Sequence, residues 1–217
     1  MLRAASCINK EVFMKKLCAF LITAILSLAV CFSAGVSAAA TEIYTVVSGD
    51  SLWKIAVKYQ VGLSEIIAAN PQFADPNLIY PGQKVTIPLK DETVTSYEQK
   101  VVDLVNEQRA KNGLGKLTAN WELSRVARYK SQDMHDKKYF SHTSPTYGSP
   151  FDMMKSFGIS YRSAGENIAQ GYKTPKAVVD GWMNSSGHRA NILNASYTQI
   201  GVGYVADGHY WTQMFIG

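Results

Sequence analysis

The chain has 217 residues, of which 47% are hydrophobic and 18% are charged. This composition is typical of globular domains and excludes bulk disorder. The net charge of +5 falls to +2 outside residues 1–40, since four of the 22 basic and one of the 17 acidic residues lie there. A strongly basic, nucleic-acid-binding surface is therefore not expected.

Residues 1–40 have the pattern of a secretory signal peptide. Lys15 and Lys16 precede an almost wholly apolar run over residues 17–32, and small residues follow it. Met14 fits as the start, because the residues before it carry no such pattern. The apolar run approaches the ~20 residues of a membrane-spanning helix, so an anchor is the alternative. The small-residue end favours cleavage, and we expect no stable membrane anchor afterwards.

The cysteines support the same separation of signal peptide and mature protein. Cys7, Cys18 and Cys31 all lie within residues 1–40. The mature protein would therefore have no cysteine and no disulfide. Many small secreted domains depend on disulfides, so we expect this one to depend on core packing alone.

The segment that follows predicts the order strand, helix, helix, strand. Residues 43–47 are rich in β-branched side chains, which favours a strand. Apolar residues then recur at helical spacing after Asp50 and Ser51, either of which can cap the helix. Ser64 is placed to cap a second helix, and alternating residues around 85–87 indicate a returning strand.

A polar stretch over residues 90–96 predicts a linker between two domains, at 41–89 and 97–217. In the second domain, the pattern predicts a helix that ends near Lys111 and another over about 119–135. Next come a short helix around Phe151 and a helix that opens at Thr174-Pro175. The chain then closes with a pair of strands over residues 200–205 and 210–216. These last elements predict a mixed domain large enough for one core.

The first domain resembles the LysM family. The matching pieces are Tyr44-Thr45-Val46, Gly49-Asp50-Ser51-Leu52, Ile55-Ala56, Ile66, Asn70-Pro71, Tyr80-Pro81-Gly82-Gln83 and Ile87-Pro88. The resemblance implies a βααβ module that binds polymers containing N-acetylglucosamine, chiefly peptidoglycan or chitin. A loop at a helix N-terminus offers free backbone N–H groups, and an apolar loop opposite can pack on a sugar face. The candidate glycan-binding residues are Gly49, Asp50, Ser51, Leu52, Asn77, Leu78 and Ile79.

The second domain resembles the CAP superfamily in its bacterial, SCP-like form. The matching pieces are Tyr139-Phe140-Ser141-His142, Gly165-Glu166-Asn167-Ile168-Ala169, the segment 182–193 and Ile200-Gly201-Val202-Gly203-Tyr204. The resemblance implies an α-β-α sandwich, so that the whole chain is α+β. It also implies a cavity lined by two histidines and two acids. His142, Glu166 and His188 match three of these, whereas the fourth position holds Ser185, which cannot ionise.

The three remaining side chains allow several kinds of chemistry. Neutral His142 and His188 could bind Zn²⁺ loosely, with Glu166 as a third ligand or as a base for bound water. Without metal, a His–Glu pair can act as acid and base near neutral pH. A purely structural cluster is the alternative. His135 and His209 are expected at the surface or at a strand edge rather than as ligands.

Together these features predict a secreted protein that is bound to the cell wall. The small module would bind peptidoglycan, and the larger domain would present its His/Glu-lined cavity to a ligand or partner. Two alternatives remain open: a metal-assisted hydrolase of the wall, and a structural component of a spore coat or wall layer. Whether the protein is an enzyme is left undecided by the sequence.

Overall fold

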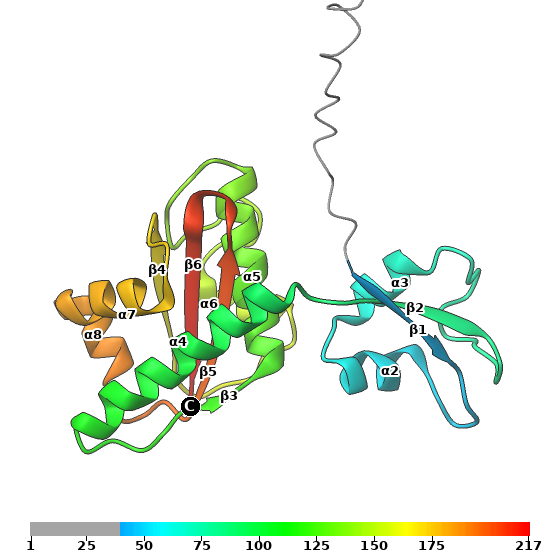
Figure 1. Ribbon diagram of the computed structural model, residues 1–217, viewed down its shortest axis with the longest axis horizontal. Helices are drawn as coiled ribbons and strands as arrows, with labels where there is room; N and C mark the ends of the chain where they lie inside the picture. Colours follow the sequence, from blue (N-terminus) through cyan, green and yellow to red (C-terminus); the bar gives the residue numbers. More distant parts are fainter. Residues whose placement is uncertain (1–39) are drawn as a thin grey trace, which may run out of the picture. The chain divides into compact units, whose positions relative to one another are not determined.

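The computed structural model describes residues 40–217 (Figure 1). The predicted signal peptide lies outside this range, apart from its last residue. Within residues 40–217, no helix is long and apolar enough to cross a membrane. The module that precedes residue 89 and the domain that follows it are described separately below.

The N-terminal module has the predicted order of strand, helix, helix and strand. Its elements are β1 (Thr41–Thr45), α2 (Leu52–Tyr59), α3 (Leu63–Ala69) and β2 (Lys84–Pro88). The two strands pair antiparallel, with Tyr44 opposite Val85. Both helices cover this ribbon through a small core of buried side chains: Val46, Leu52, Ile55, Ala56, Val61, Ile66, Val85 and Ile87.

The helix caps of this module agree with the sequence at one helix and differ at the other. Ser51 caps α2, because its hydroxyl accepts a hydrogen bond from the Lys54 N–H at 3.2 Å. The prediction that Ser64 caps α3 is wrong. Gly62 occupies the N-cap position without a side-chain bond, and the Ser64 hydroxyl donates to the Glu65 carboxylate instead.

The C-terminal domain consists of a four-stranded sheet with helices on both faces. Its elements are α4 (Glu92–Lys111), β3 (Thr118–Ala119), α5 (Trp121–Asp136), α6 (Pro150–Ser156), β4 (Ala164–Gln170), α7 (Pro175–Asn184), α8 (Ser186–Ile192), β5 (Gln199–Val205), η1 (Asp207–His209) and β6 (Tyr210–Ile216). The strand order is β3-β5-β6-β4, which places β4 at one edge. Helices α4 and α7 pack on one face, and α5 and α6 pack on the other (Figure 1).

Helix α4 begins inside the stretch that was predicted to be a linker. Asp91 caps it by accepting a hydrogen bond from the Val94 N–H at 3.1 Å, so the helix already starts at Glu92. The polar composition of residues 90–96 is therefore that of a first, solvated helical turn. At the other end, the predicted stop at Asn112 is confirmed.

Two glycines of β5 allow α5 to lie directly on the sheet. A Cβ atom at Gly203 would come within 2.2 Å of the Ala127 carbonyl carbon, and one at Gly201 would meet the Leu123 backbone at 2.3 Å. Residues two apart in a strand share one face, so both glycines leave the face under α5 without side chains. The sequence Ile-Gly-Val-Gly-Tyr thus gives one face to α5 and presents its large side chains to the other.

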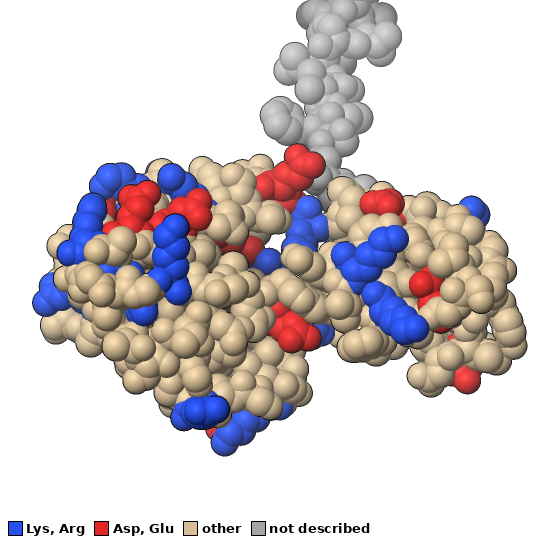
Figure 2. All heavy atoms as spheres, turned by 90° about the horizontal axis from the view of Figure 1, so that it is seen from below, with Lys and Arg blue, Asp and Glu red and all other residues tan. Residues whose placement is uncertain are grey.

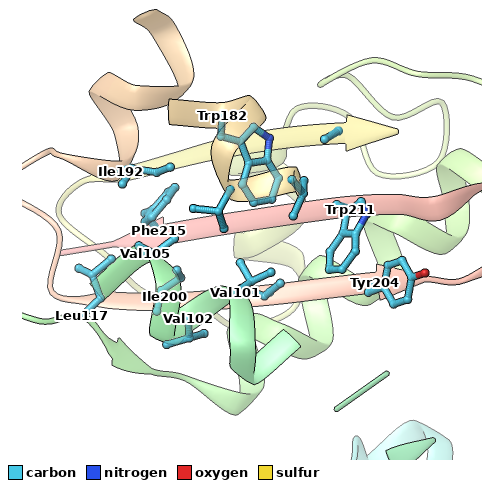
Figure 3. Packing of buried hydrophobic residues seen from close by; sticks show 14 of the residues in the cluster. Val101, Val102, Val105, Leu117, Trp182, Ile192, Ile200, Tyr204, Trp211 and Phe215 are labelled. Carbon is cyan, nitrogen blue, oxygen red and sulfur yellow. The ribbon is translucent and has the colours of Figure 1, made fainter. Parts of the chain in front are cut away.

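The main core fills the space between the sheet, α4 and α7. Figure 3 shows Val101 and Val105 of α4 facing Ile200 of β5, with Trp182 of α7 over the same face. Trp182 is 1% exposed, and its indole N–H donates to the Ile168 carbonyl at 3.3 Å. A large side chain with a satisfied polar atom therefore joins α7 to the edge strand β4.

The α+β class and the sandwich architecture are confirmed, but two of the elements that carry site residues have no counterpart in the sequence prediction. These are β4 and α8, and they carry Glu166 and His188 respectively. β4 reads Ala-Gly-Glu-Asn-Ile-Ala-Gln, with one β-branched residue, and it is a strand because β6 pairs along its whole length. The pairing with β6 is therefore what makes this segment a strand.

Candidate functional site

The centre of the candidate site is a contact between His142 and Glu166. The His142 Nδ1 atom lies 2.7 Å from the Glu166 Oε1 atom. The Glu166 side chain is 1% exposed, whereas that of His142 is 53% exposed. A buried carboxylate thus orients an accessible imidazole. When His142 is neutral, this contact places its proton on Nδ1 and leaves Nε2 free to accept a hydrogen bond.

Strand β4 places Glu166 and its neighbour on opposite faces of the sheet. Glu166 lies opposite Met214 of β6, on the face covered by α5. Asn167 lies opposite Gln213 and points to the other face, where its amide donates to Gln213 Oε1 at 3.0 Å and to the His188 carbonyl at 3.1 Å. Successive side chains of a strand point to opposite faces. β4 therefore presents the Glu166 carboxylate on one face and contacts α8 from the other.

His188 lies in the first turn of α8 and is half-buried. Burial lowers the pKa of His188, and the nearby charge of His142 lowers it further. His188 is thus neutral at neutral pH, the form that can accept a hydrogen bond or bind a metal. The side-chain amide of Asn191, also on α8, donates to the Glu166 carbonyl at 3.1 Å and ties this helix to the edge strand.

Two buried polar atoms in this region have no hydrogen-bond partner within residues 40–217: Glu166 Oε2 and Gln213 Nε2. A buried polar atom that is left unpaired costs about 1–3 kcal/mol. The free oxygen of Glu166 belongs to the carboxylate that holds His142. Because this oxygen is buried, the acceptor that an approaching ligand can reach is Nε2 of the exposed His142 ring, when that ring is neutral.

The side chains of the predicted zinc site do not form a three-residue ligand cluster. Within the described residues, no group of three or more His, Cys, Asp and Glu side chains could hold a metal ion. His142 and His188, with Glu166, remain the residues that would take part in such a site. Their donor set of two imidazoles and one carboxylate suits Zn²⁺ in kind, but Glu166 Oε1 already bonds His142.

The other two histidines make contacts with protein groups. His135 contacts Asp136 at 2.6 Å through Nδ1 and Asp207 at 2.9 Å through Nε2. His209 Nδ1 lies 2.7 Å from the Tyr204 hydroxyl. Both therefore have local partners near the β5–β6 turn.

In the N-terminal module, the two predicted glycan-binding loops lie next to each other. Val46 donates a backbone hydrogen bond to the Gln83 carbonyl and accepts one from the Gly82 N–H at 2.8 Å. The loop that begins at Val47 is therefore fastened to the turn that follows residues 77–79. Val47, Leu78 and Tyr80 are each 55% exposed, which leaves apolar surface beside the free N–H groups of α2.

The candidate residues of these loops differ in what they offer a ligand. Gly49, Asn77 and Leu78 are exposed. The Asp50 carboxylate already accepts hydrogen bonds from the Tyr44 hydroxyl and the Val47 N–H, both at 2.9 Å. Ser51 caps α2, while Leu52 is 2% exposed and Ile79 packs against the core. Leu78 therefore offers the most apolar surface among them.

Comparison with known proteins identifies both parts of the chain. The model of the cysteine-rich secretory protein family, CAP, matches residues 102–215, just over half of the chain. The chain belongs to this family. A LysM domain matches residues 44–88, so the chain has a LysM domain followed by a CAP domain, as the sequence predicted.

Two relatives of the CAP domain come from Bacillus subtilis (strain 168). The uncharacterized protein YkwD is 66% identical over 125 residues, which are 58% of this chain and 49% of YkwD. The uncharacterized membrane protein YlbC is 44% identical over 122 residues, which are 56% of this chain and 35% of YlbC. The chain thus spans half or less of the length of these curated relatives.

The CAP domain is also similar to a solved structure. A crystal structure of an extracellular protein with an SCP domain from Bacillus anthracis str. Ames matches with 37% identity and a TM-score of 0.55, covering 63% of this chain and 47% of that one. The α-β-α sandwich is therefore the fold of the CAP domain.

Several polar residues around the CAP site were not predicted from the sequence. Gln213 and Asn167 are fully buried, and Asn191 joins them by donating to the Asn167 side-chain oxygen at 2.9 Å. Gln213 could have been noticed as a polar residue within the apolar run Tyr-Trp-Thr-Gln-Met-Phe. Lys130 and Asp133 of α5 gave no such signal, because charged residues on a long helix are ordinarily solvated.

Proposed function

We propose that this is a secreted, wall-associated protein that binds peptidoglycan through its LysM domain and a second wall component through its CAP domain. The observation that carries the CAP part is the exposed His142 imidazole held at 2.7 Å by the buried Glu166 carboxylate. The mixed surface charge agrees with a glycan partner rather than a nucleic acid. Figure 2 shows acidic and basic side chains interspersed over the visible face of the CAP domain.

The support for glycan binding is the pair of adjacent loops in the LysM domain. One supplies the free N–H groups at the start of α2, and the other supplies the exposed side chain of Leu78. Neutral sugars are bound by this combination of backbone donors and apolar platforms. One LysM copy would bind weakly, because it lacks the avidity of a repeated array.

We expect Leu78→Ala to weaken binding of the full chain to purified peptidoglycan sacculi by about fivefold, or about 1 kcal/mol of binding free energy. Its half-exposed side chain has apolar area to bury against a sugar. Co-sedimentation at a series of sacculus concentrations measures the effect. Ile43→Ala is the control, since Ile43 is 58% exposed on β1 and lies in neither loop. Equal losses in both variants would count against a loop-borne glycan site.

The support for ligand binding by the CAP domain is an exposed hydrogen-bond acceptor that has no protein partner among residues 40–217. Nε2 of the exposed His142 ring is free to accept a hydrogen bond when the ring is neutral, because Glu166 holds Nδ1. We propose that it binds a hydroxyl or amide N–H group, such as those of the sugars and stem peptides of the wall. The ligand would then donate to the imidazole that the buried carboxylate orients.

We expect soluble muropeptides to shift the NMR signals of the His142 ring in the full chain. Glu166→Gln should reduce their affinity at least about tenfold, because a charge-assisted hydrogen bond is lost. Muropeptide masses should stay unchanged during the titration. Cleavage by the native chain but not by His142→Ala would contradict a pure binding role and support the hydrolase. Unmoved His142 signals at saturating muropeptide would exclude this ligand class.

A further inference from the structure

The loop that carries His142 is held down by a buried lysine. Lys130 of α5 is 0% exposed. Its ammonium group donates to the carbonyl oxygens of Ser141 and His142, both at 2.8 Å, and to the Tyr139 hydroxyl at 3.3 Å. The three donors of the ammonium are thus used on the residue that bears the imidazole and on its near neighbours.

One helical turn further along α5, the Asp133 carboxylate binds side chains of the same loop. Its carboxylate accepts hydrogen bonds from the hydroxyls of Tyr139 and Ser144, both at 2.6 Å, and from that of Thr146. Burial acts to raise the pKa of Asp133, but these hydrogen bonds outweigh it and lower the pKa. Residues three apart lie on one face of a helix, so Lys130 and Asp133 contact the loop together.

Removing the charged groups of Lys130 and Asp133 from water costs free energy. A gain in stability therefore does not explain why the two residues are buried. Charged groups that lose water are often replaced by apolar residues at no loss in stability. Burial lowers the pKa of Lys130, while the charges of Glu166 and Asp133 act in the opposite direction. The contacts fix one loop conformation, which apolar packing on a segment without regular structure would not specify.

We propose that Lys130 and Asp133 are positioning residues that hold the loop so that His142 Nδ1 faces Glu166. This inference rests on the proposed role of that pair in ligand binding. The two residues do not touch the ligand themselves. They fix the backbone of His142, while Glu166, held by the β4–β6 pairing, fixes the far end of the contact.

The histidine tautomer reports this positioning directly. When neutral His142 is held against Glu166, its proton lies on Nδ1, whereas free histidine favours the proton on Nε2. We expect Lys130→Met to shift His142 towards the Nε2–H form, as seen in ¹⁵N-detected NMR spectra of the full chain. Amide hydrogen exchange of loop residues 140–146 should become at least about tenfold faster.

Arg109→Met is the matched control. Arg109 is also buried and also bonds carbonyl oxygens, those of Ile192 and Asn194, but it holds the end of α8. It should destabilise the domain without changing the His142 tautomer. Because loss of Lys130 threatens folding itself, Tyr139→Phe is the milder second variant, since it removes one hydroxyl that contacts both Lys130 and Asp133.

The proposal is overturned if His142 keeps its Nδ1–H form in both Lys130→Met and Tyr139→Phe. It is also overturned if Arg109→Met changes the tautomer equally, because the effect would then be general loosening. A native chain that binds no muropeptide, but whose His142 tautomer depends on Lys130, would contradict the proposed function and leave the positioning role in place.

Discussion

Buried cations in the CAP domain bind backbone carbonyls more than carboxylates. The Arg109 guanidinium donates to the carbonyl oxygens of Gly115, Ile192 and Asn194 at 2.8–2.9 Å. Burial lowers its pKa. Each of these carbonyls lies in a loop or at a helix end, where the backbone has no partner of its own. A single side chain therefore replaces the regular hydrogen bonds that these segments lack.

Glycine at position 203 is required by contact rather than by backbone conformation. We expect Gly203→Ala to lower the free energy of unfolding by at least about 2 kcal/mol, because the new methyl group would press on the α5 backbone. Urea unfolding monitored by circular dichroism measures the change.

Gly115→Ala is the control for that substitution. A Cβ atom at Gly115 meets nothing within 4 Å, so the change should stay within about 0.5 kcal/mol. If the two variants unfold at the same urea concentration, close packing of α5 on β5 is not what Gly203 provides.

Some site residues could be predicted from the sequence, while their supports could not. His142 and Glu166 stand in short motifs, and the structure brings them together at 2.7 Å. Asp133 is one of many charged residues on a polar helix, and its burial follows only from the path of the loop that folds back onto α5. Contacts with an irregular loop leave no periodic pattern in the sequence.

At the scale of elements, the end of α5 is joined to the β5–β6 turn by one histidine. His135 lies between the carboxylates of Asp136 and Asp207, and it also packs edge-on against Tyr210. Hydrogen bonds that the imidazole donates to these carboxylates raise the pKa of His135, while burial and the charge of Lys138 act in the opposite direction. The contact joins the last turn of a helix to a turn 72 residues away in the sequence.

This contact should make stability depend on pH. A pKa raised by folding gives stabilisation that is complete below the unfolded pKa of about 6.5 and is lost as the pH rises through the folded value. We expect the native chain to lose more stability than His135→Gln between about pH 6 and about pH 9. Chemical denaturation across that range tests it, and superimposable profiles would show that His135 carries no such linkage.

Elements with a strong local signal were predicted, and those made by pairing were not. Thr174 caps α7 and Pro175 opens it, as the sequence indicates. The β5–β6 hairpin was predicted, and its turn contains Gly208 at a φ of 74°, which glycine adopts readily. By contrast, β4 depends on its neighbour, and α8 is seven residues long and lacks a side-chain cap.

For the whole molecule, the class and the order of domains could be predicted because the motifs of both families are contiguous in the sequence. The residues that the structure describes contain no cysteine, so no disulfide stabilises either domain there. The CAP domain is held instead by a sheet between two helical layers, with Trp182, Trp211 and Phe215 almost completely buried. Larger domains bury a greater share of their surface and can dispense with cross-links.

The position of β4 at the rim of the sheet has a consequence for behaviour at high protein concentration. An exposed strand invites pairing with another chain, which leads to aggregation. Here the Asn191 amide donates a hydrogen bond to the outward carbonyl of Glu166. At the opposite rim, β3 is two residues long and offers little edge for pairing. The helix that bears His188 thus also shields the outermost strand, and variants at Asn191 risk self-association as well as a loosened site.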